Sequence, residues 1–220
     1  MVYGAVAILS AYLLGSINFA VIFTRLFTKK DVRNYGSGNA GTTNVMRVGG
    51  VVPGILTFVC DMLKGFFACY IGKILFECLK DKTDYDGKIV IYGTLLCGVF
   101  CTIGHVFPVF FEFKGGKGVA VGAGVFLCVC PKALVIGLLI FAVLMLITRI
   151  VSLSSLAATT AVVVCNMIFY NKNASFIIQA VMALAVWLII ILKHSDNIKR
   201  LVKGEEKKLT ISKADKSKPA

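Results

Sequence analysis

The chain of 220 residues is 58% hydrophobic and only 16% charged, with a mean hydropathy of +0.85, which lies outside the range of soluble globular domains. Its formal net charge of +13 does not indicate nucleic acid as a partner, because the basic residues lack a soluble scaffold and a base-stacking aromatic surface. Anionic membrane lipid and phosphorylated small molecules are the partners that this composition favours.

Apolar stretches recur from the N-terminus to about residue 193, and several could cross a hydrocarbon core of about 30 Å. Seven can be marked, at residues 3–27, 51–79, 88–113, 117–130, 133–149, 151–170 and 174–193. The first has no basic opening and no cleavage site, so we expect a permanent span rather than a signal peptide. The fourth and fifth are short and flank Pro131, which leaves open two tilted helices or one interrupted hairpin. The sequence therefore predicts an all-α integral membrane protein, a bundle of about seven transmembrane helices.

The basic residues predict the orientation, because lysine and arginine are retained on the cytoplasmic side of a membrane. With seven spans, most of them fall in alternate connections, the first from Arg25 to Arg47 and the last from Lys193 to Lys218. We therefore expect the N-terminus outside and the C-terminus in the cytoplasm. The predicted units are a membrane domain at residues 1–204 and a basic, disordered cytoplasmic tail at 205–220.

All eight cysteines lie within apolar stretches, without a C-x-x-C pair and without histidine at metal-ligand spacing. They are interpreted as small apolar packing residues. Neither a metal site nor a cofactor is predicted.

The first connecting loop, Tyr35 to Gly50, is dense in glycine and small polar residues. Glycines let backbone N–H groups approach an oxyanion, and side chains can add further donors. Those side chains are Ser37, Asn39, Thr42, Thr43, Asn44 and Arg47. The loop can hold a phosphate; an ordinary turn rich in glycine, serine and asparagine is the alternative.

The second loop, Glu112 to Gly122, joins two lysines to a run of glycines that leads into an apolar helix. Such a loop can place N–H groups and a helix N-terminus around an anion, with Lys114 or Lys117 supplying charge. Its spacing differs from that of a Walker A loop. His105 precedes it, and a histidine at the end of a span can equally be a structural, hydrogen-bonded residue.

A third polar cluster, His194 to Arg200, follows the last span directly. On a continuing helix, His194 and Asn197 would share one face, where His194 could position a hydroxyl or a phosphate. Glu206 would fasten this segment. The alternative is a basic segment that only marks the exit of the chain from the membrane.

Charged residues also occur within or beside the spans. Asp61 and Lys64 are three residues apart, so they can form an ion pair that offsets the cost of burial. Arg149 is interpreted as an interfacial anchor, and substrate contact stays an alternative for all three residues. The three polar clusters fall on the side that the basic residues mark as cytoplasmic, which favours one composite site.

At these residues the sequence resembles the PlsY family, bacterial membrane acyltransferases that use acyl phosphate. The matching motifs are GSIN (15–18), GSGNAGTTNVMR (36–47), Asp61 with Lys64-Gly65, GHVFPVFFEFKGGKGVAVG (104–122), RIVSLSS (149–155) and HSDNIKRLVKGEE (194–206). Two positions depart from the family pattern: Thr42 stands where alanine is usual, and Val121 where threonine is common.

The resemblance implies transfer of an acyl group from acyl phosphate to the 1-hydroxyl of glycerol 3-phosphate, giving lysophosphatidic acid and phosphate for phospholipid synthesis. It implies a multi-pass protein of the bacterial inner membrane with its active site facing the cytoplasm, without cofactor, associated with acyl-phosphate-forming and downstream lipid-synthesis enzymes. The predicted catalytic residues are Ser37, Arg47, Lys117, His194 and Asn197. The predicted substrate-binding residues are Gly36, Gly38, Asn39, Thr43, Asn44, His105, Lys114, Gly115, Gly116, Gly118, Arg149 and Ser152. The predicted structural supports are Asp61, Lys64 and Glu206.

Two phosphates must lie close together in this reaction, and cations and N–H dipoles must offset their repulsion. We expect no acyl-enzyme intermediate, with a substrate phosphate oxygen accepting the proton. Neither His105 nor His194 is followed five positions later by aspartate, the arrangement of acyl-CoA-dependent acyltransferases, which disfavours a CoA thioester donor. A transporter for a phosphorylated metabolite is the rival function, since basic loops and a broken span also suit alternating access. A structural partner in a lipid-synthesis assembly is the third.

Overall fold

The computed structural model describes residues 2–80, 88–170 and 176–209, which form α-helices and two short 3-10 helices and contain no strand. The α-helices are α1 (Val2–Gly15), α2 (Phe19–Thr28), α3 (Thr42–Gly49), α4 (Val51–Lys80), α5 (Lys88–Val106), α6 (Val119–Val129), α7 (Pro131–Thr148), α8 (Val151–Tyr170), α9 (Phe176–Lys193) and α10 (Ser195–Val202). The 3-10 helices are η1 (Val32–Asn34) and η2 (Val109–Phe111). The predicted all-α fold is confirmed.

Within these described residues, six helical segments are long and apolar enough to cross a membrane. They are Tyr3–Thr28, Val51–Cys78, Lys88–Phe111, Pro131–Thr148, Val151–Tyr170 and Phe176–Lys193. The seventh apolar helix, α6, has 11 residues and is therefore about 16 Å long, roughly half the thickness of the hydrocarbon core. A multi-span membrane protein is confirmed, while the number of crossings and the orientation stay predictions.

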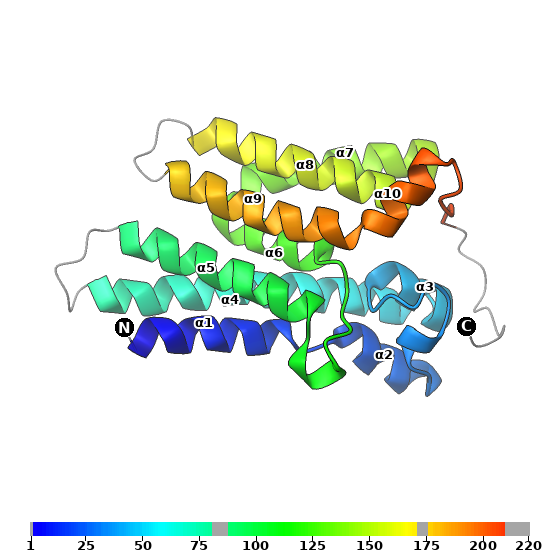
Figure 1. Ribbon diagram of the computed structural model, residues 1–220, viewed down its shortest axis with the longest axis horizontal. Coiled ribbons are helices and arrows are strands. Elements are labelled where there is room, and N and C mark those ends of the chain that lie inside the picture. The colour runs from blue at the N-terminus through cyan, green and yellow to red at the C-terminus, as the bar shows by residue number, and fades with distance from the viewer. Residues whose placement is uncertain (1, 81–87, 171–175, 210–220) are drawn as a thin grey trace.

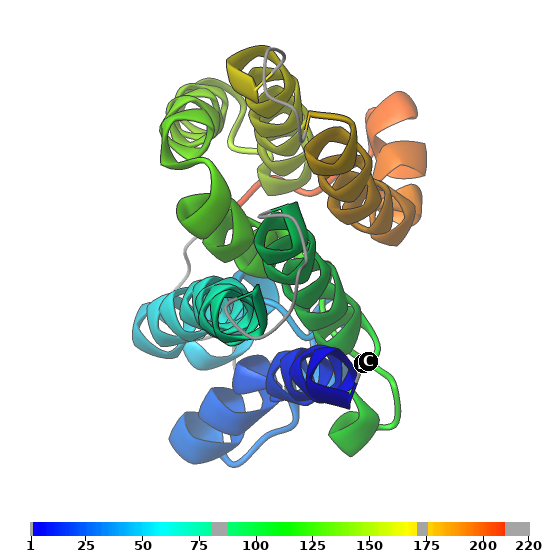
Figure 2. The same cartoon turned by 90° about the vertical axis from the view of Figure 1, so that its left-hand side faces the viewer.

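The short helix α6 lies in the middle of the bundle. Both ribbon views show α1, α4 and α5 on one side and α7, α8 and α9 on the other, with α6 between them (Figures 1 and 2). Each side has its own buried apolar cluster, and α6 contributes to both: Val121 packs with α1, α4 and α5, and Phe126 packs with α5 and α7 to α9. Burial on both sides explains why α6 is apolar all round.

One end of the bundle carries α2, α3 and α10, and the start of α1 lies at the opposite end (Figure 1). The connection containing η2 and the start of α6 lies at the end with α2 and α3 as well. The three polar segments at residues 35–50, 112–122 and 194–200 therefore share one end of the molecule, which we call the polar end.

The first apolar stretch, expected as a permanent span, is one candidate span made of two helices, α1 and α2. Gly15 packs so tightly on the backbone of Cys101 in α5 that a Cβ there would overlap its carbonyl oxygen. Asn18 then begins α2, since its side-chain oxygen accepts the Val21 N–H at 3.2 Å. The break leaves the Ile17 carbonyl oxygen free to accept a hydrogen bond from outside the helix.

That carbonyl oxygen is used by the buried Lys64, whose Nζ lies 2.6 Å from it. The same Nζ lies 2.8 Å from Oδ1 of Asp61, and both side chains are about 97% buried. The expected i,i+3 ion pair is therefore present. His105 Nδ1 lies 3.6 Å from the same carboxylate oxygen. The broken first span thus supplies a backbone acceptor that helps to stabilise a charge in the bundle interior.

Replacing Lys64 with methionine should destabilise the fold by about 3–5 kcal/mol, because it leaves the Asp61 carboxylate buried without its cation. The thermal unfolding midpoint of the purified protein in detergent measures the effect. Asp61→Asn combined with Lys64→Met removes both charges and should restore most of the loss. A double variant as unstable as Lys64→Met alone would contradict this account.

Candidate active site

A cavity of about 640 Å³ opens at the polar end of the bundle. Most of the predicted site residues line it: Ser37, Gly38, Asn39, Thr43, Asn44, Arg47, Asp61, His105, Gly115, Lys117, Gly118, Ser152, His194, Asn197 and Glu206. They come from loops and helix ends separated by more than 150 residues in the chain. The folded bundle therefore brings the three polar segments to one place.

Five predicted site residues lie outside the cavity wall. Lys64 does not line the cavity itself but pairs with Asp61, which does. Gly116 donates its N–H to the His105 carbonyl oxygen at 3.1 Å. The exposed Lys114 pairs with Glu112 at 3.2 Å. The remaining two are in turns: Gly36 has a left-handed φ of 64°, and the exposed Arg149 ends α7 with a φ of 59°. Of the two lysines between which the sequence could not choose, only Lys117 lines the cavity.

Within the described part of the chain, four helices begin at this cavity. Their first-turn residues in its wall are Thr42 and Thr43 of α3, Val119 and Ala120 of α6, Val151 and Ser152 of α8, and Asp196 and Asn197 of α10. The first N–H groups of a helix have no carbonyl partner within it, and the helix dipole is positive there. Such an arrangement suits a ligand with more than one anionic group.

The first loop is shaped by the buried Asn44. Its Nδ2 donates to the carbonyl oxygens of Val32 at 3.0 Å and Tyr35 at 2.9 Å, and its Oδ1 accepts the Ser37 N–H at 2.9 Å. The Asn44 amide therefore holds the loop closed on itself. In this way it places Ser37 and Gly38 at the cavity.

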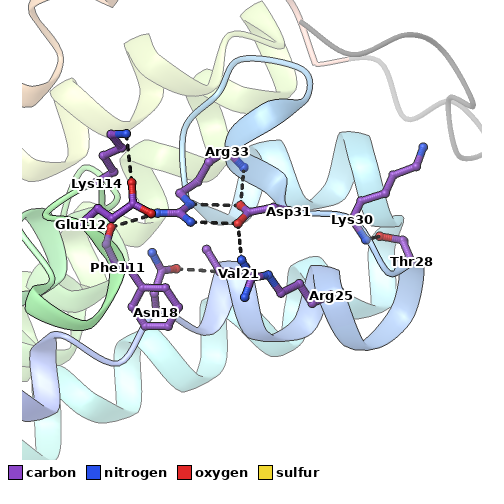
Figure 3. Close-up of polar contacts among 10 residues, drawn as sticks. All are labelled: Asn18, Val21, Arg25, Thr28, Lys30, Asp31, Arg33, Phe111, Glu112 and Lys114. Carbon is purple, nitrogen blue, oxygen red and sulfur yellow. Dashed lines mark hydrogen bonds and ion pairs between the residues drawn. The ribbon is translucent and has the colours of Figure 1, made fainter.

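A second polar cluster, which we call the Asp31 clasp, joins η1, directly before the first loop, to η2 (Figure 3). Asp31 accepts a two-pronged pair from Arg33, with Nε at 3.1 Å and Nη2 at 2.9 Å, and a further contact from Arg25 Nη2 at 2.6 Å. The Arg33 hydrogen bonds lower the pKa of Asp31 to about 2, although burial opposes this. Arg33 Nη1 also donates to the Phe111 carbonyl oxygen at 2.9 Å. The clasp thereby fixes the loop of Ser37 relative to the loop of Lys117.

Lys117, in the cavity wall, is held by an amide. Its Nζ donates to Oδ1 of Asn197, whose Nδ2 donates to Glu206 Oε1 at 2.5 Å. Burial lowers the pKa of Lys117; Glu206 opposes that effect, and the guanidinium groups of Arg200 and Arg47 add to it. The ammonium thus contacts a neutral group and keeps its charge available for a ligand.

The Glu206 carboxylate is the anchor of this chain of contacts. It accepts Ser152 Oγ at 2.8 Å and Arg200 Nε at 2.6 Å in addition to the Asn197 amide. Burial raises the pKa of Glu206, but these three donors outweigh it and leave the pKa below its usual value. Glu206 is therefore ionised at neutral pH and ties α8 to α10.

His194 is 97% buried in the cavity wall, and its Nδ1 lies 2.8 Å from the Ile190 carbonyl oxygen. A carbonyl oxygen can only accept, so this contact assigns the proton of the neutral ring to Nδ1 and leaves Nε2 as an acceptor. Burial lowers the pKa of His194 to about 4, and the contact with Ile190 opposes this. His194 is thus neutral at physiological pH and can accept a hydrogen bond from a hydroxyl group.

The Arg47 side chain, in α3, has no hydrogen-bond or ion-pair partner among residues 2–80, 88–170 and 176–209, although it lines the cavity. Its guanidinium is therefore available to an anion.

Sequence reasoning missed part of the cavity wall: Gly41, Phe58, Val119, Ala120, Phe141, Val151, Ser155, Lys193, Asp196, Arg200 and Lys207. Thr42, which the sequence analysis named as a possible donor, lines the cavity as well. Asp196 and Arg200 belong to the polar cluster at His194 to Arg200, and their spacing on a helix could have indicated that they face the same site. Phe58 and Phe141 lie in long apolar helices, where no local signal separates them from lipid-facing neighbours. Val121, which departs from the family pattern, is fully buried in the apolar cluster and does not line the cavity.

Comparison with known proteins gives a consistent result. The family model described as glycerol-3-phosphate acyltransferase matches residues 5–204. Glycerol-3-phosphate acyltransferase 2 of Bacillus anthracis is 41% identical over 90% of this chain and 95% of its own, and the Finegoldia magna enzyme is 38% identical over 90% and 92%.

Two crystal structures of PlsY, an integral membrane glycerol 3-phosphate acyltransferase, are also similar. The glycerol 3-phosphate form superposes with a TM-score of 0.79 at 34% identity, and the lysophosphatidic acid form with 0.77 at 33%. Each comparison covers 94% of this chain and 96% of the other.

Lys117→Ala should weaken the binding of inorganic phosphate by about tenfold or more, because the variant removes a partly buried ammonium from the cavity wall. Isothermal titration of the detergent-purified protein measures the affinity. Lys114→Ala is the matched control, since it removes a lysine three residues away that does not reach the cavity. Equal weakening in both variants would show that only general surface charge matters.

Arg33→Lys should lower the thermal unfolding midpoint and weaken phosphate binding, because a lysine cannot bind Asp31 with two prongs and also reach the Phe111 carbonyl oxygen. Arg25→Lys, at the exposed edge of the same carboxylate, should leave both measurements nearly unchanged. The role of the clasp would be refuted if the two variants behaved alike.

Proposed function

The chain belongs to the glycerol-3-phosphate acyltransferase family, and from this membership we propose that it transfers an acyl group from acyl phosphate to the 1-hydroxyl of glycerol 3-phosphate. The products are lysophosphatidic acid and inorganic phosphate, the first step of bacterial phospholipid synthesis. The observation that carries the proposal is a cavity where four helices begin and where Arg47 and Lys117 project without a carboxylate partner. The relatives are acyltransferases, so the transporter alternative receives no support from them.

The cavity has a polar part and an apolar flank, which suits one water-soluble substrate and one lipid substrate. The apolar flank includes Phe58 of α4, Phe141 of α7 and Val119 of α6. Because α4 and α7 are long and apolar enough to cross a membrane, a fatty acyl chain can extend along them without leaving the bilayer. The acyl phosphate head group then lies beside the helix N-termini.

Holding two phosphates together is the main electrostatic task. Their repulsion falls when cations and N–H dipoles are already directed at them before binding, which also avoids reorganisation during the reaction. Arg47 reaches the cavity from α3, and Lys117 reaches it from the loop directly before α6. Two cations supplied by separate elements are consistent with binding two phosphates.

In the proposed reaction, the 1-hydroxyl oxygen attacks the acyl carbonyl carbon, and the bond between that carbon and the bridging phosphate oxygen breaks. His194 Nε2 accepts a hydrogen bond from the hydroxyl and orients it. The proton passes to a phosphate oxygen, because a phosphate with a second pKa of about 6 is a stronger base than His194 with a pKa of about 4. No acyl-enzyme intermediate forms. Acyl phosphate is already an activated donor, so we expect no cofactor.

We place the cavity at the cytoplasmic face of the bacterial inner membrane. The connections that hold Arg25 to Arg47 and Lys114 and Lys117, and the segment that holds Lys199 and Arg200, belong to the polar end, and lysine and arginine are retained on the cytoplasmic side. This orientation puts the start of α1 outside. It also lets the site meet anionic lipid and enzymes that supply acyl phosphate or consume lysophosphatidic acid.

Purified protein mixed with palmitoyl phosphate and glycerol 3-phosphate should form lysophosphatidic acid, detected by mass spectrometry, with release of inorganic phosphate. Palmitoyl-CoA in place of palmitoyl phosphate should give no product. Absence of product from palmitoyl phosphate would refute the enzyme, and product from palmitoyl-CoA alone would overturn the donor.

Arg47→Ala should lower turnover by about 100-fold or more, because it removes a preorganised cation from a charged transition state. The folded yield and the unfolding midpoint should change little, since Arg47 binds no other described residue. Lys203→Ala removes an exposed charge at the end of α10, outside the cavity wall, and should retain normal turnover. Near-normal turnover of the Arg47→Ala variant would contradict the proposed role of Arg47 in the active site.

A further inference from the structure

The chain after α10 turns back towards the cavity through a specific helix ending. Gly204 has a left-handed φ of 71°, its N–H donates to the Leu201 carbonyl oxygen at 3.0 Å, and the Glu205 N–H donates to that of Arg200 at 2.8 Å. These two bonds and the left-handed residue define a Schellman motif, which glycine adopts without steric cost. The motif reverses the chain and begins a segment at residues 204–209 that we call the tail strap.

The tail strap is tied down on both sides of Lys207. Glu206 binds Ser152 of α8 and both Asn197 and Arg200 of α10, as described above. Further on, the Leu209 N–H donates to the Arg149 carbonyl oxygen at 2.7 Å, in the turn between α7 and α8. These residues belong to the tail that the sequence predicts to be disordered; residues 210–220 lie outside the described residues. The strap is therefore positioned by its own contacts before any substrate binds.

Lys207 lies between these two anchors and lines the cavity. In the part of the chain that the structure describes, its ammonium has no hydrogen-bond or ion-pair partner. Lys208, the next residue, is equally exposed but is not part of the cavity wall. The strap thus presents one of two adjacent lysines to the site.

We propose that Lys207 is a substrate-binding residue for the phosphate of glycerol 3-phosphate, an inference that rests on the function proposed above. Lys207 is exposed to water, which is the side from which the small soluble substrate enters. The acyl phosphate is assigned to the apolar flank of Phe58 and Phe141, which belong to helices that can cross a membrane, whereas residues 204–209 lie outside those helices. Because the strap is already anchored, fixing this ammonium on a phosphate costs less conformational entropy than it would on a free tail.

Steady-state kinetics of three variants test the inference. Lys207→Ala should raise the KM for glycerol 3-phosphate about tenfold, the loss expected for one charge-assisted hydrogen bond at a water-exposed position. Its kcat and its KM for palmitoyl phosphate should stay within about twofold of the parent protein. Lys207→Arg should restore most of the affinity, and Lys208→Ala should match the parent protein in every constant.

Calorimetric binding of glycerol 3-phosphate to the same variants separates the two proposals. If the parent protein forms no product but Lys207→Ala binds glycerol 3-phosphate more weakly than Lys208→Ala, the reaction is wrong and the role of Lys207 stands. If the parent protein is active and Lys207→Ala keeps its KM for glycerol 3-phosphate, the inference is overturned. Equal losses in Lys207→Ala and Lys208→Ala would also overturn it, because they would reflect only the net charge of the tail.

Discussion

A site for two anions at the end of a membrane bundle must hold its cations close together without neutralising them, and the rest of this structure follows from that constraint. Cations paired with carboxylates would be stable but would have little charge to offer a phosphate. Here the amide of Asn197 stands between Lys117 and Glu206, so the carboxylate fixes the lysine through a neutral group. The negative charge of Glu206 is balanced by Arg200, and its carboxylate also accepts a hydrogen bond from Ser152. The Arg47 side chain, which also lines the cavity, is left available to a ligand.

The short helix α6 makes this arrangement compatible with a membrane fold. Because it covers only about half of the hydrocarbon thickness, it can begin deep in the bundle with its N-terminus at the cavity and its sides packed on both halves. A full-length span would carry its first residues out to the interface. The buried Asp61 and Lys64 pair lies beside the same cavity, and its lysine depends on the break between α1 and α2 for a second acceptor. Two interruptions of apolar segments therefore contribute to the site: the short α6 brings a helix N-terminus to the cavity, and the break between α1 and α2 supplies an acceptor for Lys64.

Much of this could be predicted from the sequence, since long apolar stretches specify membrane helices and polar, glycine-rich loops stand out against them. The choice between Lys114 and Lys117 could not, because it depends on how the loop is held by the distant Asn197. The apolar flank could not be predicted either, because the sequence does not distinguish Phe58 and Phe141 from the large apolar residues that face lipid on the same helices. The tail strap did leave a local signal in Gly204, a glycine directly after a helix, but the strongly polar composition that follows it favoured disorder.

Several polar side chains in and around this site hydrogen-bond to other protein groups and so position them. Asn44 closes the first loop, Asp31 ties that loop to η2 through Arg33, and Glu206 ties the tail to α8 and α10. That distribution suits a reaction whose donor already carries its leaving group and whose phosphate can take the proton. The protein then has little covalent chemistry to perform, and its contribution to rate comes from the geometry in which it holds two phosphates and one hydroxyl. Small displacements of the loops should consequently affect turnover as strongly as the loss of a contact to substrate.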